Sequence, residues 1–135
     1  MQFNEPLSHL MYAGADIIVV PSMFEPCGLT QMIAMRYGTV PVVRKTGGLN
    51  DTVFDIDHDA DRAEHSGIEG GPNGFVFEGT DNGALDYALN RAIDAWYGAR
   101  DWWNRELVPR IMKQDWSWNG PALEYAELYH AARQK

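Results

Sequence analysis

The 135-residue sequence contains one cysteine, Cys27, and has few basic side chains, with 11 Lys and Arg against 19 Asp and Glu and a formal net charge of -8. A single cysteine excludes an internal disulfide bond and a cysteine-rich metal site. Nucleic acids and anionic membranes bind clustered Lys and Arg, which this chain lacks. It also has no apolar run as long as a membrane span, and no signal-peptide or transit-peptide character at its start. We therefore expect neither nucleic acid nor a membrane as a partner.

Residues 17–46 predict a β-α-β unit. The apolar run at residues 17–20 ends at a proline and is typical of a parallel strand with both faces covered. Apolar residues at helical spacing (Leu29, Met32, Ile33 and Tyr37) then predict a helix that a glycine closes. A second short strand is expected at residues 40–43, and the chain is long enough for one hydrophobic core but not for two.

The loop between the first strand and this helix carries Glu25, and Gly28, Leu29 and Thr30 begin the helix. In open α/β sheets, ligands sit outside the carboxyl ends of the strands, where the first N–H groups of a helix are unpaired and carry a positive partial charge. These groups suit a phosphate, whereas a glutamate suits the hydroxyl groups of a sugar or ribose. The loop therefore predicts a sugar-nucleotide site, although a Glu and a Gly in this position also serve ordinary turns and caps.

Two residues close to this loop have a structural interpretation beside a functional one. Cys27 is either a small packing residue, the default for a free cysteine, or a wall of the ligand pocket. Lys45 is either a ligand neighbour on the cleft side or the solvated end of the second strand. The double glycine that follows, Gly47 and Gly48, permits a tight turn and a close approach of another backbone segment.

Residues 55–74 are acidic, polar and rich in glycine, and we expect them to form a loop. Their Asp and His side chains invite a metal-site interpretation, but no EF-hand pattern is present and a charge run is usually a solvated surface. A short strand is expected at residues 75–77, followed by a helix capped by Thr80 or Asp81. All five tryptophans lie at residues 96–118. They are predicted to fill the core, although such rings also stack on glucan chains.

Other helix boundaries follow from caps and breakers. Ser8 is predicted to cap the first helix, and Ser117 or Asn119 the last one. Pro109 predicts a kink or break in the helix between them, because proline has no N–H to donate.

The string FEPCGLTQ at residues 24–31 resembles the C-terminal half of starch synthases and bacterial glycogen synthases. YAGAD at 12–16 and RKTGGLNDTV at 44–53 extend the similarity, and DWSW at 115–118 with ELY at 127–129 resembles the C-terminal end of the same family. The similarity covers nearly the whole chain. It is somewhat stronger to the plant and algal starch synthases than to the bacterial enzymes.

The resemblance implies an α/β fold, with a partial Rossmann-like parallel sheet and flanking helices. This would be the later part of the second domain of a two-Rossmann (GT-B) glycosyltransferase. Residues 1–98 would form an incomplete nucleotide-sugar-binding subdomain and residues 99–135 a C-terminal helical segment. The family's final helices brace the first domain, so without that domain their apolar surface would be exposed.

The resemblance also implies a reaction, the transfer of glucose with retention from an ADP-glucose donor to the non-reducing end of an α-1,4-glucan acceptor. Glu25 would bind glucose hydroxyls near the reacting carbon, Cys27 would line the sugar pocket, and the N–H groups of residues 28–30 would face the phosphates. Lys45 belongs to the counterpart of a first-domain motif that contacts the diphosphate. No metal and no cofactor is implied.

Many relatives with this architecture carry a second glutamate eight residues after the first, where this chain has Ile33; starch and glycogen synthases share that departure. Because other ligands of the diphosphate lie outside these residues, the chain is not expected to catalyse alone. The alternative is a non-catalytic glucan-binding or regulatory fragment. The location implied is the plastid for a plant or algal source and the cytoplasm for a bacterial one.

Overall fold

The computed structural model describes residues 4–134 and contains a parallel sheet of three strands in the order β1-β2-β3. The strands are β1 (Ile17–Val20), β2 (Val40–Arg44) and β3 (Phe75–Phe77). Ile17 is in register with Val40, and Val42 with Phe75. The predicted α/β class and all three predicted strands are confirmed, and β2 runs one residue further than expected.

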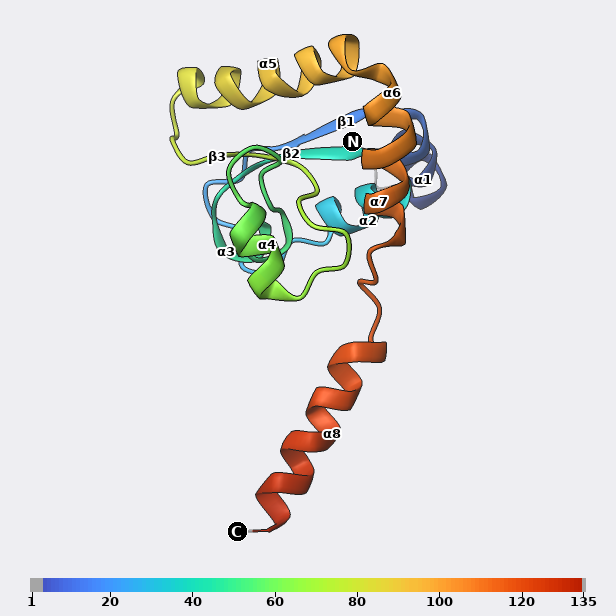
Figure 1. The fold of residues 1–135 in the computed structure, drawn as a ribbon, viewed down its shortest axis with the longest axis vertical. Helices are drawn as coiled ribbons and strands as arrows, with labels where there is room; N and C mark the ends of the chain where they lie inside the picture. The colour runs from blue at the N-terminus through green and yellow to red at the C-terminus, as the bar shows by residue number, and fades with distance from the viewer. Residues whose placement is uncertain (1–3, 135) are drawn as a thin grey trace.

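Helices cover both faces of this sheet (Figure 1). The long helix α5 lies along one face, and α2, α3 and α4 lie on the opposite side. The helical elements are α1 (Glu5–Gly14), α2 (Thr30–Arg36), α3 (Gly47–Thr52), α4 (Ala60–Ser66), α5 (Asn82–Gly98), α6 (Arg100–Trp102), the π-helical turn η1 (Trp103–Leu107), α7 (Val108–Lys113) and α8 (Asn119–Arg133). Both faces of β2 and β3 are thereby largely buried, which is why these strands are almost continuously apolar, whereas Val19 of the edge strand β1 is exposed.

The main core lies between the sheet, α5 and the helical segment from α6 to α7. Trp103 is 1% exposed and stacks on Phe75 with ring centroids 6.4 Å apart. Leu107 and Ile111 are fully buried in the same cluster, so Trp103 fills the core as predicted. The division of the chain at residue 98 stays a prediction.

The helical segment does not break at Pro109, whereas the kink predicted as the other outcome stays a prediction. The helix runs from α6 through η1 into α7, and Pro109 is the second residue of α7. The π turn changes the hydrogen-bond register immediately before the proline. The missing N–H therefore falls where the hydrogen-bond pattern is already interrupted, and the helix continues.

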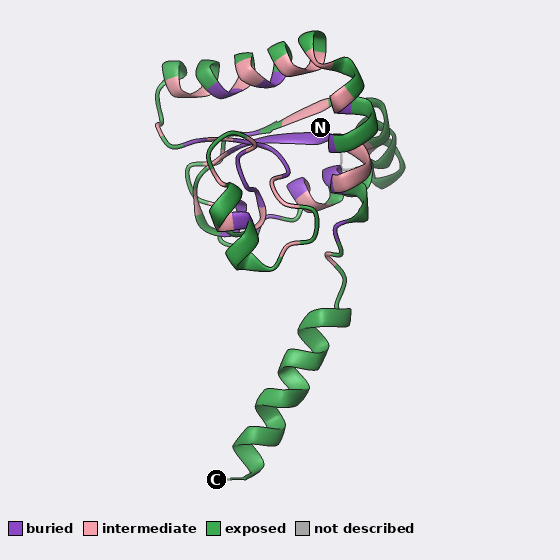
Figure 2. Ribbon diagram, viewed as in Figure 1, coloured by how far each residue is buried: buried purple, intermediate pink, exposed green. Residues whose placement is uncertain are grey.

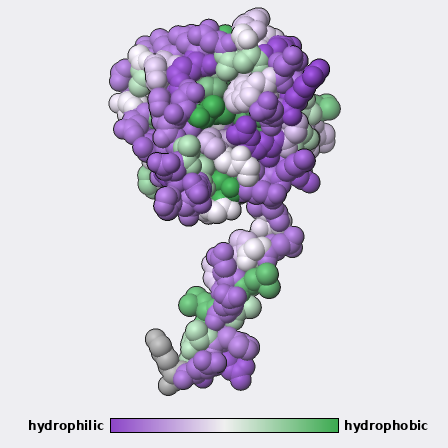
Figure 3. All heavy atoms as spheres, viewed as in Figure 1, coloured by the Kyte–Doolittle hydropathy of each residue, from purple (hydrophilic) through white to green (hydrophobic). Residues whose placement is uncertain are grey.

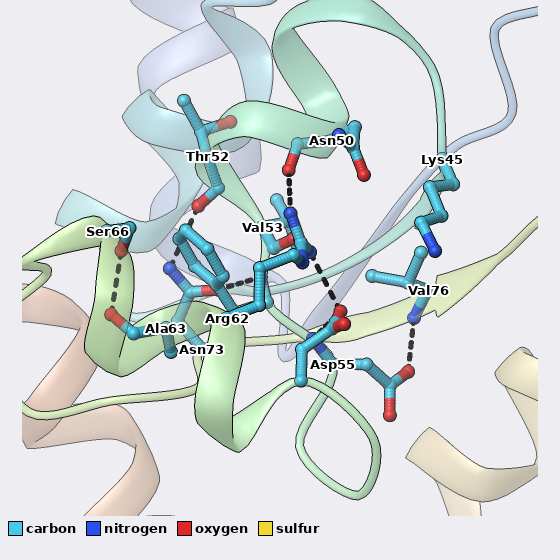
Figure 4. A network of polar contacts seen from close by, with 12 residues as sticks. Lys45, Asn50, Thr52, Val53, Asp55, Arg62, Ala63, Ser66, Asn73 and Val76 are labelled. Atoms are coloured by element: carbon cyan, nitrogen blue, oxygen red, sulfur yellow. Dashed lines mark hydrogen bonds and ion pairs between the residues drawn. The ribbon is translucent and has the colours of Figure 1, made fainter.

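The segment at residues 55–74, predicted to be a loop, contains the helix α4. A β-bridge between Asp55 and Gly74 joins the two ends of this segment. Arg62 of α4 donates hydrogen bonds to the carbonyl oxygens of Asn50 and Val53, which satisfies acceptors at the end of α3 (Figure 4). This polar contact holds the short helix in place. Apolar periodicity could not predict it, because only Ala63 of α4 is buried.

The caps predicted for α1 and α8 are wrong, whereas one of the two caps predicted for α5 is confirmed. Asn4, not Ser8, caps α1: its Oδ1 accepts the N–H of Leu7 at 3.0 Å. At α8 the N-cap position is Trp118, which makes no side-chain capping bond, although Ser117 Oγ accepts the N–H of Asn119 at 3.2 Å. Asp81 caps α5 as predicted, since its Oδ1 accepts the N–H of Ala84 at 3.0 Å.

Helix α8 extends away from the rest of the fold and has no buried residue (Figures 1 and 2). Its large apolar side chains are 51% to 69% exposed (Leu123, Tyr125, Leu128 and Tyr129). Figure 3 shows apolar groups along this helix. The exposed apolar surface expected for the last helix is therefore present.

None of the helices between residues 4 and 134 combines the length and apolar character needed to cross a bilayer. Within the same range, no group of three or more His, Cys, Asp or Glu side chains is arranged to hold a metal ion.

A buried ion pair fastens the acidic segment to α5. Asp55 is 2% exposed, and the guanidinium group of Arg91 donates to its two oxygens at 2.6 and 3.1 Å. The same carboxylate accepts the backbone N–H of Val76 at 2.7 Å on the outer edge of β3 (Figure 4). Burial alone would raise the pKa of Asp55, but the hydrogen bonds from Arg91, Val76 and Asp57 favour the charged form more, so the pKa lies below its ordinary value.

We expect Asp55→Asn to lower the free energy of unfolding by about 2 kcal/mol near neutral pH, because Arg91 loses its buried carboxylate partner and keeps only the more exposed Asp57. The pKa of Asp55 is lowered by folding. Its contribution is therefore complete above the unfolded value of about 3.9 and is lost as the pH falls through the lower folded value. The difference between parent and variant should shrink below about pH 4.

Urea unfolding at a series of pH values measures this difference. Asp94→Asn is the matched control, since Asp94 is an exposed residue of the same helix as Arg91. A parent-to-variant difference that does not change with pH would contradict the assignment to the Asp55 charge.

Candidate functional site

Glu25 lies in the loop that follows β1, at the carboxyl end of the sheet. Its side chain is half-buried rather than packed in the interior. The hydroxyl group of Ser22 donates to Oε2 at 3.3 Å, and no other bond to the carboxylate is present within residues 4–134. The carboxylate therefore keeps capacity to accept hydrogen bonds from a ligand.

The Glu25 loop is held against the start of α3 by backbone contact. The N–H of Gly48 donates to the carbonyl oxygen of Glu25 at 3.0 Å. A Cβ atom on Gly47 would lie 2.2 Å from that oxygen, and one on Gly48 would lie 1.7 Å from the carbonyl oxygen of Cys27. The close backbone approach predicted for the double glycine is confirmed, and only glycine leaves room for it.

Gly28, Leu29 and Thr30 connect this loop to α2. Gly28 is buried with φ +71°, a conformation that residues with a Cβ rarely adopt. Leu29 occupies the N-cap position and Thr30 is the first residue of the helix. In the described part of the chain, the N–H groups of Leu29 and Thr30 donate to no protein acceptor. These donors remain available beside Glu25.

Cys27 is exposed, so the default interpretation of this residue as a packing residue is wrong. It lies in the same loop as Glu25, with its thiol on the surface. Lys45 is on the neighbouring loop, two residues before Gly47, and its Nζ donates to Glu78 Oε1 at 2.7 Å. This hydrogen bond and the positive charge of Lys45 both lower the pKa of Glu78.

Lys45 is an exposed residue directly after β2, so both interpretations of it stay open. It lines an open hollow of about 470 Å³ together with four other residues (Thr46, Gly47, Asn50 and Glu78). Five of the six predicted site residues therefore lie in the loop after β1 and at the first residue of α2, and Lys45 lies on the neighbouring loop. The roles predicted for them stay predictions.

Of the four apolar residues that predicted α2, only Met32 packs against the main core. Leu29, Ile33 and Tyr37 are 61%, 38% and 39% exposed, and they border a hollow of about 620 Å³ against residues 113–117. The buried side of α2 consists instead of Gln31, Ala34 and Met35. Sequence analysis passed over Gln31 because a polar residue among apolar ones is normally placed on the exposed face.

The family model described as "Glycosyl transferases group 1" matches residues 3–105 of the sequence. The chain belongs to this family. Among group 1 glycosyltransferases it is 67% identical over 134 residues to soluble starch synthase 3 of Solanum tuberosum, covering 99% of this chain and 11% of that protein. It is 56% identical over 133 residues to glycogen synthase 1 of Synechococcus sp. (strain JA-3-3Ab), covering 98% of this chain and 26% of that protein.

A solved structure shows the same fold. The catalytic domain of starch synthase IV from Arabidopsis thaliana, bound to ADP and acarbose, superposes with a TM-score of 0.87 at 46% identity. The match covers 100% of this chain and 26% of that chain. The resemblance to starch and glycogen synthases is therefore confirmed. The fold class is also confirmed, because the structural neighbours of this group 1 glycosyltransferase chain are GT-B enzymes.

Proposed function

We propose that the chain forms the later part of the second, donor-binding domain of a starch or glycogen synthase. Such an enzyme would transfer glucose with retention from ADP-glucose to the non-reducing end of an α-1,4-glucan. The identity of 67% to a starch synthase over 134 residues carries this proposal. The relative bound to ADP and acarbose supports a nucleotide and a saccharide as ligands.

In the proposed site, the free N–H groups of Leu29 and Thr30 face the diphosphate, and Gly28 shapes the turn that presents them. Glu25 accepts hydrogen bonds from glucose hydroxyls near the reacting carbon, and the exposed Cys27 lines the sugar pocket. Departure of ADP builds negative charge on the phosphate oxygens. Donors that are already oriented stabilise this charge without reorganisation.

Lys45 would add a positive charge near the diphosphate. Its present partner Glu78 is exposed, and water screens an exposed ion pair so that it is weak. A phosphate group can therefore replace Glu78 at low cost.

The other ligands of the diphosphate and the remainder of the cleft would come from a first Rossmann-like domain, braced by the apolar side of α8. On this proposal the chain is inactive alone. The relatives from Solanum tuberosum and Arabidopsis thaliana are named as chloroplastic and amyloplastic proteins, which supports a plastid location for a plant or algal source.

Incorporation of radiolabelled ADP-glucose into glycogen tests the proposal. The chain is assayed alone and in a chimera in which it replaces the matched 134 residues of the Solanum tuberosum protein. We expect incorporation by the chimera and none by the chain alone. A folded chimera that binds glycogen but incorporates no glucose would overturn the proposal and favour the glucan-binding alternative.

A further inference from the structure

Gln31 is a fully buried polar residue directly behind the Glu25 loop. Its Nε2 donates to the carbonyl oxygen of Gly28 at 2.7 Å and to Thr52 Oγ1 at 2.8 Å. Thr52 Oγ1 in turn donates to the carbonyl oxygen of Gly48 at 2.6 Å. Because Gly48 also bonds to Glu25, these contacts connect both ends of the loop to α3.

The protons in this chain of contacts can be assigned. Thr52 has one hydroxyl proton, which goes to Gly48, so its oxygen accepts from Gln31. Both protons of Gln31 Nε2 are then used, and a flipped carboxamide would place its oxygen against the carbonyl of Gly28. The orientation of the Gln31 side chain is therefore fixed by its partners.

Gln31 Oε1 is buried and has no hydrogen-bond partner within residues 4–134. A buried unpaired acceptor costs about 1 to 3 kcal/mol. A methionine of similar length would avoid this cost and fill the same space. Stability alone does not account for a glutamine here, whereas its two donated bonds act directly on the loop.

We propose that Gln31 is a positioning residue for the donor loop. By holding the Gly28 carbonyl against Thr52, it fixes the turn that presents the amides of Leu29 and Thr30 beside Glu25. This inference rests on the proposed function, since the loop positions a donor only if the chain binds one.

The test compares Gln31→Met with Gln114→Met in the chimera. Gln114 is a matched control: it is 1% exposed, its Nε2 also donates two bonds, to the carbonyl oxygens of Glu69 and Gly71, and its Oε1 accepts from Asn73. Both variants lose buried hydrogen bonds. We expect kcat to fall about tenfold or more in Gln31→Met, because small displacements of positioning groups are costly, and to stay within about twofold in Gln114→Met.

Gln31→Glu gives a second, pH-dependent readout. A carboxyl group facing the Gly28 carbonyl is buried, so its pKa is raised and its protonated form still donates one bond. Activity relative to the parent should therefore decline as the pH rises. A parent-like pH profile would contradict the proposal.

Amide hydrogen exchange on the chain itself separates this inference from the proposed function. The Gly48 amide, bonded to Glu25, should exchange about tenfold faster or more in Gln31→Met and at the parent rate in Gln114→Met. If the parent chimera is inactive, the proposed function fails, while the exchange result still decides whether Gln31 holds the loop. Parent-like Gly48 exchange in Gln31→Met would overturn the inference.

Discussion

Gly48→Ala is expected to lower the free energy of unfolding by about 3 kcal/mol. The added Cβ would lie 1.7 Å from the carbonyl oxygen of Cys27 and 2.4 Å from its carbonyl carbon. These are backbone atoms, so no side-chain rotation relieves the clash, and the Glu25 loop must move away from α3. For a domain of this size the change corresponds to a Tm roughly 10 °C lower or more. Thermal unfolding followed by circular dichroism measures it.

Gly98→Ala is the control for this prediction. A Cβ at Gly98 meets no atom within 4 Å, and alanine favours a helix more than glycine by about 1 kcal/mol. The control should therefore leave Tm unchanged or raise it slightly. A Tm for Gly48→Ala equal to that of the parent would show that the loop does not contact α3 as described.

In the chimera, Gly48→Ala should also lose most of its transferase activity, since the displaced loop carries Glu25.

Much of this fold could be predicted from the sequence because its strands are short apolar runs between strong breakers. Residues 17–20 end at a proline, and residues 75–77 lie between two glycines. The double glycine was recognised for the same reason, since two adjacent glycines before a helix indicate close backbone approach. The string FEPCGLTQ marked the candidate site through its resemblance to a family rather than through its physical chemistry.

The features that sequence analysis missed depend on polar contacts between distant segments. Helix α4 is held by Arg62, whose partners lie up to 12 residues earlier in the chain. Gln31 is buried because Thr52 and Gly28 provide acceptors for it, which hydrophobic periodicity cannot indicate. In both cases a polar residue is bonded within the fold, and its partners lie in other segments of the chain.

The apolar spacing that predicted α2 identifies the helix but not the face that the helix buries. Leu29, Ile33 and Tyr37 have the spacing of a buried face, but the structure turns them toward a hollow. Spacing identifies which residues share a face of a helix. It does not identify what that face contacts, which is decided here by the Gln31 bonds and by the packing of Met35 in the core.

Glu25→Ala is expected to lower kcat of the chimera by about 10² to 10³, the usual cost of removing one group that stabilises the transition state. The change should barely affect folding. The carboxylate makes one long bond of 3.3 Å, to Ser22, and a half-buried loop residue of this kind contributes little to stability. The measurement is glucose incorporation from ADP-glucose at saturating donor, with Tm determined on the same protein.

Glu25→Gln separates charge from hydrogen bonding at this position, and Glu64→Ala is the control. Glu25→Gln keeps an oxygen that accepts sugar hydroxyls but loses the negative charge, so its kcat should fall less than that of Glu25→Ala if hydroxyl binding is the main role. Glu64→Ala, at an exposed residue of α4, should leave kcat within about twofold of the parent. If Glu25→Ala retained kcat within that same margin, the carboxylate would have no part in the reaction, and the donor would have to be held by other groups of the loop.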